Sequence, residues 1–288
     1  MITTKNNRFF AFGCSFTKYF WPTWADLVAT NFIEGNYYNY GQAGMGNNYV
    51  HDSLMYADQF HKINKDDVVI ICWSEFHRKD FFVEGKWRRF HDADSAIEWW
   101  DPTGYLISDI SLIKSAKILL EYIGCKYYFL SLADISKPYR DDHVAWWSKN
   151  TENSPVPLLL DSYSDIVYPI IGKSFNNMFG HASDIGHNRS HPLTKELSKL
   201  DSHPLVDEHF RYIQSVLPNS LLPDSLLVDD LYKKTLELLG NEMPKKDGQW
   251  QLAFNNLTVK NYWGIQFGYD QRNKIYEEEF GVKNYYDN

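Results

Sequence analysis

The fold is decided by the stretch RFFAFGCSFT, residues 8–17. Its residues 9–12 are apolar without interruption, which is typical of a strand buried on both faces of a parallel sheet. Gly13 then permits a tight turn, and this turn places Ser15 at the carboxyl end of the strand. Because ligands of open α/β sheets bind at that edge, the stretch predicts both a central strand and a candidate site at Ser15.

Strand and helix patterns alternate along the chain from this point. Apolar runs predict further strands at residues 36–40, 67–72 and 126–132. Stripes at helical spacing predict helices between them and after them, at residues 21–32, 50–61, 110–123, 204–216 and 227–238. Asn47 and Asn48 are expected to cap the second of these helices and His203 the fourth, with Pro204 in its first helical position. The alternation indicates a parallel, doubly wound sheet.

Two segments interrupt the alternation, and one follows it. Residues 79–106 are charged and rich in Trp, and residues 134–200 contain several prolines and a His-rich cluster. We interpret both as insertions in one α/β domain, residues 1–240, and the second as a candidate lid. Residues 241–288 have no clear period, and we expect a C-terminal extension that serves as an added arm or an oligomer contact.

Composition excludes several classes of protein. A net charge of −8 argues against a general nucleic-acid binder. No stretch reaches 18 consecutive apolar residues and the first residues lack a signal-peptide pattern, so we expect a cytoplasmic protein without membrane contact. Three cysteines without C-x-x-C spacing indicate buried free thiols. The chain has 10 Trp and 20 Tyr, which serve packing or stack on sugars.

Chemistry at Ser15 requires partners, and the sequence offers them. A serine hydroxyl needs a general base, and histidine titrates in the right range for that task. His203 is the candidate base, and Asp201, on the same loop, is the candidate orienting carboxylate. The backbone N–H groups of Ser15 and Gly44 are the candidate oxyanion donors, because glycine lets the backbone approach a substrate closely.

Four blocks in order resemble the SGNH/GDSL hydrolase superfamily: FGCSFT, NYGQAG, an apolar strand ending in WSEFHR, and DSHP before a helix. The resemblance covers residues 8–217. It implies a flavodoxin-like three-layer α/β/α sandwich with a central parallel sheet, and a Ser-His-Asp triad without a cofactor. Ser15 matches the nucleophile, Asn39 and Gly44 match the glycine block, and Asp201 and His203 match the last block.

The sequence departs from the family pattern in each of three blocks. Gly-Cys-Ser replaces Gly-Asp-Ser, and Asp-Ser-His is one residue shorter than the family's Asp-x-x-His. The third block lacks the Asn that donates to the oxyanion, and Ser74 or Glu75 falls near its place. A Glu75 carboxylate cannot donate a hydrogen bond, so Asn47, Ser74 and Arg78 are the candidate substitutes. A missing donor costs on the order of 10²–10³ in rate.

The function that these residues predict is a serine-dependent ester hydrolase, with carbohydrate O-acyl groups, above all O-acetyl, as the expected substrates. Alternatives are an O-acyltransferase, or a non-catalytic glycan-binding or structural protein on the same fold. A metal site is a further alternative, although its spacing matches no helix-borne motif; the residues concerned are His181, His187, His191, Asp201 and His203.

Overall fold

The computed structural model describes the strands and helices around the predicted site. The described residues are 7–19, 21–32, 36–75, 78, 80–83, 86–89, 102–133, 174, 175, 178 and 203–242. Most of the predicted insertion 134–200 and all but two residues of the predicted extension 241–288 lie outside this set. The expectations of a lid and of an oligomer contact therefore stay predictions.

A four-stranded sheet forms the centre of the molecule, and all its strands are parallel. Its order is β2-β1-β3-β6, so the strand that the opening stretch predicted lies in the interior. The four predicted strands are confirmed within one or two residues: β1 Phe9–Gly13, β2 Tyr37–Gly41, β3 Val68–Trp73 and β6 Lys126–Ser131.

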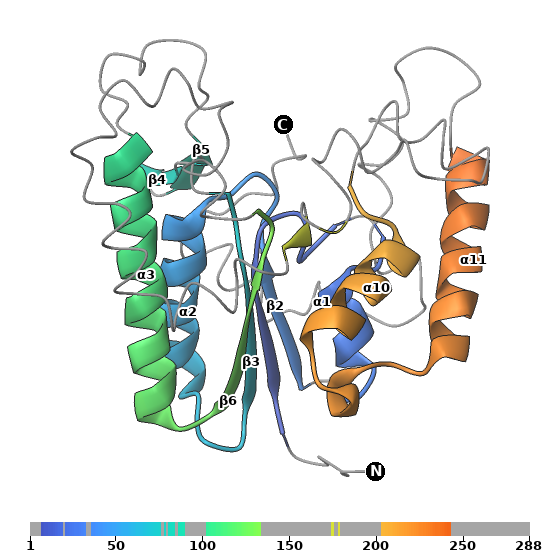
Figure 1. Ribbon diagram of the computed structural model, residues 1–288, viewed down its shortest axis with the longest axis horizontal. Helices are drawn as coiled ribbons and strands as arrows, with labels where there is room; N and C mark the ends of the chain where they lie inside the picture. The colour runs from blue at the N-terminus through green and yellow to red at the C-terminus, as the bar shows by residue number, and fades with distance from the viewer. Residues whose placement is uncertain are drawn as a thin grey trace.

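Helices cover both faces of this sheet (Figure 1). Helices α2 and α3 pack on one face, and α1 and α10 on the other, with α11 beyond α10. Their bounds are α1 Trp24–Ala29, α2 Asn47–His61, α3 Pro102–Ile123, α10 Val206–Val216 and α11 Ser225–Glu242, with a 3-10 turn η5 at Asn219–Leu221. None of the helices in the described part of the chain is long and apolar enough to cross a bilayer.

Strand β1 supplies both hydrophobic cores. Successive side chains of a strand point to opposite faces, so Phe10 and Phe12 join the core under α2 and α3, whereas Phe9 and Ala11 join the core under α1 and α10. All four side chains are fully buried. Phe10 and Phe12 also stack on tyrosines of β2, with ring centroids 4.7 and 5.2 Å apart. The uninterrupted apolar run is therefore explained by burial on both faces.

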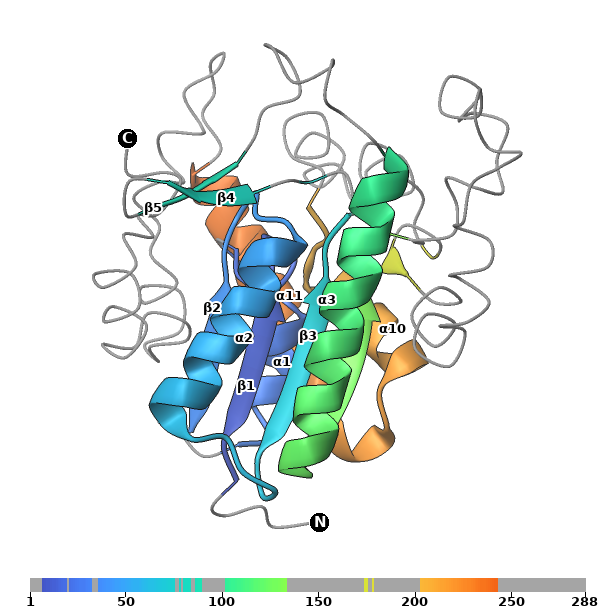
Figure 2. The same cartoon turned by 90° about the vertical axis from the view of Figure 1, so that its left-hand side faces the viewer.

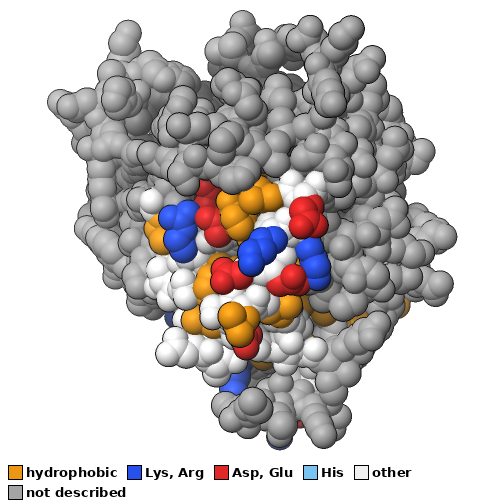
Figure 3. Space-filling view, turned by 90° about the vertical axis from the view of Figure 1, so that its right-hand side faces the viewer, with side chains coloured by type: hydrophobic (Ala, Val, Ile, Leu, Met, Phe, Trp, Pro, Cys, Tyr) orange, Lys and Arg blue, Asp and Glu red, His pale blue; other side chains and the backbone are white. Residues whose placement is uncertain are grey.

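The outer surface of α11 is polar and of mixed charge. Figure 3 shows acidic and basic side chains interspersed with hydrophobic ones on this side of the molecule. Lys234 and Asp230, one turn apart, form an ion pair of 2.6 Å. The helix extends to Glu242, so the predicted end at residue 238 is wrong.

The predicted start of α10 is also wrong. Its N-cap is Leu205, two residues after the expected His203, and its first helical residue is Val206. The Leu205 N–H donates to Glu208 Oε2 at 2.7 Å, and the Pro204 carbonyl accepts a hydrogen bond of 2.7 Å from Trp21 Nε1. These contacts hold the segment before the helix in an extended form, which leaves the His203 side chain available for another role.

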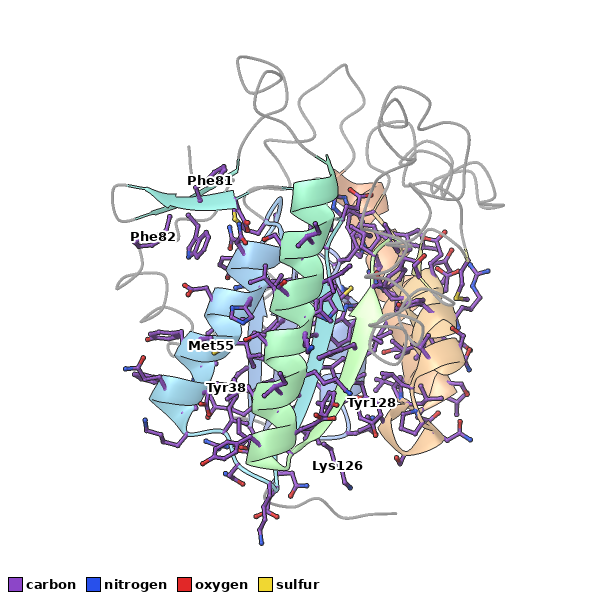
Figure 4. All side chains as sticks on the ribbon, turned by 60° about the vertical axis from the view of Figure 1, so that its left-hand side comes forward. Tyr38, Met55, Phe81, Phe82, Lys126 and Tyr128 are labelled. Carbon is purple, nitrogen blue, oxygen red and sulfur yellow. The ribbon has the colours of Figure 1, made fainter. Side chains whose placement is uncertain are left out.

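An antiparallel hairpin lies in the first predicted insertion. Its strands are β4 Asp80–Val83 and β5 Lys86–Arg89, and Figure 2 shows it across the N-terminal end of α2. Figure 4 shows Phe81 and Phe82 on this hairpin, at the opposite end of the molecule from Lys126 of β6. The insertion ends earlier than predicted, because α3 begins at Pro102.

The hairpin, and not the predicted asparagines, caps α2. The N-cap residue is Gly46, so Asn47 and Asn48 lie in the first turn and the predicted cap is wrong. The carboxylate of Asp80 accepts hydrogen bonds from the Gly46 N–H at 2.8 Å and the Tyr49 N–H at 3.0 Å. A helix N-terminus leaves such N–H groups without intrahelical partners, and Asp80 satisfies two of them from a distant part of the chain.

Candidate active site

Ser15 lies in a tight turn that directly follows β1. The N–H groups of Thr17 and Lys18 both donate to the Cys14 carbonyl, at 2.9 and 3.3 Å. A Cβ atom at Gly13 would overlap the Thr17 side chain, so this close return of the chain requires glycine. The turn is packed into the protein, and Ser15 is only 4% exposed.

His203 meets Ser15 from the extended segment before α10. Its Nε2 atom lies 2.8 Å from Ser15 Oγ, although the two residues are 188 positions apart in the chain. The imidazole stacks on Tyr19, with centroids 3.9 Å apart and planes at 18°, and it is tilted against Phe16 at 5.5 Å. A serine within hydrogen-bond distance of an oriented histidine is the arrangement that nucleophilic catalysis requires.

This pair lies where the connections of the sheet diverge. From β1 the chain passes through α1 to β2 on one side, and from β2 it passes through α2 to β3 on the other side of β1. Crevices at the carboxyl ends of parallel strands form at such a reversal, and they are the usual binding sites of open α/β sheets. Ser15 therefore occupies the position that the topology favours for a ligand.

Asp201, the predicted orienting carboxylate, lies outside the described residues. The same holds for three of the four histidines in the metal alternative, His181, His187 and His191. Within the described part of the chain, no group of three or more His, Cys, Asp or Glu side chains could hold a metal ion.

Gly44 lies in the loop after β2, and this loop is bonded to the residue at the end of β1, just before the turn that carries Ser15. The Gln42 N–H donates to the Gly13 carbonyl at 3.0 Å. Gly44 has φ of 79°, a left-handed conformation that side chains other than glycine adopt at a cost. Within the described part of the chain, neither the Ser15 nor the Gly44 N–H makes a hydrogen bond. In this part of the chain, no hydrogen bond therefore competes with the predicted role of these two N–H groups as oxyanion donors.

Asn47 has a different place from the one predicted. Its Oδ1 accepts the Ser74 N–H at 2.7 Å, and its Nδ2 donates to the Ser74 carbonyl at 3.2 Å and to Asp109 Oδ2 at 2.7 Å. Since an amide has two N–H groups, both are used inside the protein. Asn47 therefore clamps the backbone at the end of β3 and does not face a ligand.

Ser74 emerges as the candidate third oxyanion donor. Ser74 directly follows β3, which pairs in parallel with β1, so Ser74 and Ser15 lie at the same carboxyl edge of the sheet. Ile70 and Cys72 point to the face of the sheet on which the residues flanking Ser15 pack, and strand alternation continued by one step directs Ser74 to the same face. The Ser74 hydroxyl is buried and has no hydrogen-bond partner within the described part of the chain.

Glu75 and Arg78 pair with each other. Arg78 Nε lies 3.1 Å from Glu75 Oε2, and both side chains are largely buried. Burial lowers the pKa of Arg78, but its interactions with Cys14 and Glu75 outweigh this and raise the pKa overall. The Glu75 carboxylate, which would repel an oxyanion, is thus neutralised, and Arg78 lies against the residue that precedes Ser15.

Sequence reasoning missed most of the residues that support this site. Tyr19, Asp109 and Asp80 have no local pattern that would single them out. Asp26 is different, because Thr23-x-x-Asp26 has the spacing of a capping box. The Thr23 N–H indeed donates to Asp26 Oδ2 at 2.8 Å, and that pattern would have been sufficient to find it.

No protein-family model matches the chain, and searches of curated proteins and of solved structures find no match either. Fold alone does not determine function, so the functional argument depends on the geometry of the site.

Proposed function

We propose that the protein is a serine-dependent ester hydrolase of the SGNH kind, with Ser15 as nucleophile and His203 as general base. The observation that carries the proposal is the 2.8 Å separation of His203 Nε2 and Ser15 Oγ. This contact joins the two residues that the sequence offered as candidate nucleophile and candidate base. Asp201 is proposed to orient the imidazole through Nδ1.

The reaction follows from these positions. His203 Nε2 accepts the Ser15 hydroxyl proton while Oγ attacks the ester carbonyl, and the carbonyl oxygen becomes a tetrahedral oxyanion. The Ser15 and Gly44 N–H groups donate to that oxyanion. His203 then gives its proton to the leaving alcohol, and an acyl-serine remains. Water, deprotonated by the same histidine, attacks the acyl group, and the proton returns to Ser15 as the acid leaves.

Ser74 is proposed to replace the asparagine of the family's third block. A serine hydroxyl donates one hydrogen bond, as one N–H of an asparagine amide does. Its burial without a partner in the described part of the chain supports this role, since an unsatisfied buried polar group costs stability unless it serves another purpose.

A flavodoxin-like sandwich is the corresponding proposal for the fold. The parallel strands lie in the order second, first, third and fourth of the chain, with helices on both sides. This order agrees with the first four positions of the flavodoxin-like sheet. Carbohydrate O-acetyl esters are the proposed substrates, on the basis of the family resemblance and the aromatic content of the chain.

A fluorophosphonate probe tests the proposal, because such probes phosphonylate serines that a base activates. We expect one adduct by intact mass in the wild type and none in Ser15→Ala or His203→Ala. Loss of either member of a nucleophile–base pair lowers the reactivity of the serine by a factor on the order of 10³ or more. Ser111→Ala is the matched control, since that serine is exposed on α3 and should leave the adduct intact.

An unlabelled, folded wild type would overturn the hydrolase proposal and favour the non-catalytic binding protein. If the adduct forms, hydrolysis of O-acetylated sugars in water, compared with transfer of the acetyl group to an added sugar, separates the esterase from the acyltransferase.

A further inference from the structure

A closed ring of hydrogen bonds lies behind the nucleophile turn. The Thr17 carbonyl accepts hydrogen bonds from Thr23 Oγ1 at 2.7 Å and from Asn39 Nδ2 at 2.9 Å. The same Asn39 amide donates to the Tyr37 hydroxyl at 2.7 Å, which in turn donates to Asp26 Oδ1 at 3.2 Å. Asp26 Oδ2 lies 3.1 Å from Thr23 Oγ1, which closes the ring.

The direction of the hydrogen bonds in this ring depends on whether the Asp26 carboxyl carries a proton. Thr23 has one hydroxyl hydrogen but two neighbouring acceptors, the Thr17 carbonyl and Asp26 Oδ2. An ionised Asp26 draws that hydrogen to itself, because hydrogen bonds to a charged acceptor are the stronger ones. A protonated Asp26 instead donates to Thr23 Oγ1, and the Thr23 hydrogen is then free for the Thr17 carbonyl.

We propose that Asp26 is a positioning residue whose proton controls the Thr23 tether on the turn that carries Ser15. Protonation tightens the tether, and ionisation leaves the Thr17 carbonyl, within the described part of the chain, with the Asn39 bond alone. The consequence for reactivity rests on the proposed role of Ser15 as nucleophile, whereas the hydrogen-bond exchange itself does not.

The titration of Asp26 falls in a useful range. Burial raises the pKa of Asp26 to about 6, although hydrogen bonds from Thr23 and Tyr37 and the charge of Lys18 act to lower it. In the described part of the chain, these are the groups that act on the carboxyl: Thr23 from the start of α1, Tyr37 from β2 and Lys18 from the turn. Burial also raises the pKa of Tyr37 well above its usual value, so this phenol stays neutral and cannot be the switching group.

The Thr17 carbonyl can be observed directly by NMR in the full chain. Labelling threonine with ¹³C at the carbonyl and lysine with ¹⁵N selects Thr–Lys pairs, of which the sequence has three, at 4–5, 17–18 and 194–195. Loss of one signal in Thr17→Ser identifies the relevant pair. We expect its carbonyl shift to titrate with a midpoint near pH 6, and to do so equally in His203→Ala, which lacks the neighbouring imidazole.

Variants of the ring separate the switch from general packing. Asp26→Asn should make the carbonyl shift independent of pH between 5 and 8. Thr23→Val, which lacks the hydroxyl, should do the same while the ¹³C signal of the Asp26 carboxyl still titrates, and Thr23→Ser should restore the response. A carbonyl shift that is flat in the wild type while Asp26 titrates, or a response that persists in Thr23→Val, would overturn the proposal.

Reactivity of Ser15 provides the functional measurement. The fluorophosphonate rate should fall about fivefold in Thr23→Val, the effect of one net hydrogen bond, and stay within about twofold in Thr23→Ser. Equal rates in Thr23→Val and the wild type would refute the positioning role. If the wild type is not labelled at all, the proposed function fails, but the carbonyl titration still decides the hydrogen-bond exchange.

Discussion

Two loops at the carboxyl edge of neighbouring strands build the candidate site, and each is held by a buried carboxylate that acts through an amide side chain. After β1, Asp26 reaches the Thr17 carbonyl through Thr23, Tyr37 and Asn39. After β3, Asp109 accepts a hydrogen bond from the Asn47 amide, and this amide binds both the N–H and the carbonyl of Ser74.

The difference between these supports is one of rigidity. The clamp after β3 resembles one rung of a β-ladder, because the amide of Asn47 pairs with the N–H and C=O of Ser74 as a neighbouring strand would. The support after β1 ends on a carbonyl alone and includes a hydroxyl with two competing acceptors. The clamp after β3 fixes a proposed oxyanion donor, whereas the support after β1 is proposed to let the turn that carries Ser15 respond to a proton.

The largest effect on stability is expected from breaking the β3 clamp. Asn47→Ala removes the side chain that bonds the Ser74 N–H, the Ser74 carbonyl and Asp109 Oδ2, and we expect a loss of about 3 kcal/mol in the free energy of unfolding. Urea denaturation measures it. Asp109→Asn is the matched control, since its amide oxygen can still accept from Asn47, and it should lose much less; an equal loss in both variants would contradict the clamp.

The next effect concerns rate rather than stability. Ser74→Ala should lower kcat on an ester substrate about 10²-fold, as expected for loss of one oxyanion donor, and should change the free energy of unfolding little because its hydroxyl has no partner in the described part of the chain. Ser53→Ala, a buried serine of α2 bonded to the Val50 carbonyl, is the control and should keep the wild-type rate. Unchanged kcat in Ser74→Ala would remove Ser74 from the proposed site.

The smallest expected effect is the pH dependence of the free energy of unfolding that Asp26, in the support after β1, confers. Because the folded-state pKa of Asp26, about 6, lies above its ordinary 3.8, the folded protein holds a proton that the unfolded chain has lost between these values. Stability from this group is therefore greatest at low pH, falls as the pH rises toward 6 and levels off above it.

Asp26→Asn removes this dependence. The free energy of unfolding of the wild type, relative to the variant, should fall by about 2 kcal/mol between pH 4.5 and pH 7, since one pKa unit corresponds to about 1.4 kcal/mol. Urea titrations of both proteins across this range provide the test, and parallel curves would show that Asp26 does not titrate as inferred.

Local sequence determined the strands and the position of the proposed nucleophile. An uninterrupted apolar run followed by Gly13 is sufficient to predict a buried strand, a tight turn and a hydroxyl at the sheet edge. Apolar runs and turn residues are patterns among neighbours in sequence, so β1, β2, β3 and β6 were predicted within one or two residues. Element ends were less accurate at α2 and α10, because Asp80 and Trp21, which are distant in the chain, decide where these helices begin.

Tertiary structure decided which polar groups meet. The sequence offered Ser15 and His203 as partners, but only folding brings residues 188 positions apart to 2.8 Å. It also assigned Asn47 to a structural clamp, paired Glu75 with Arg78 and left Ser74 as the candidate donor. The physical reason is that a hydrogen-bonding side chain can serve any of several partners, and the choice depends on which of them burial places within reach.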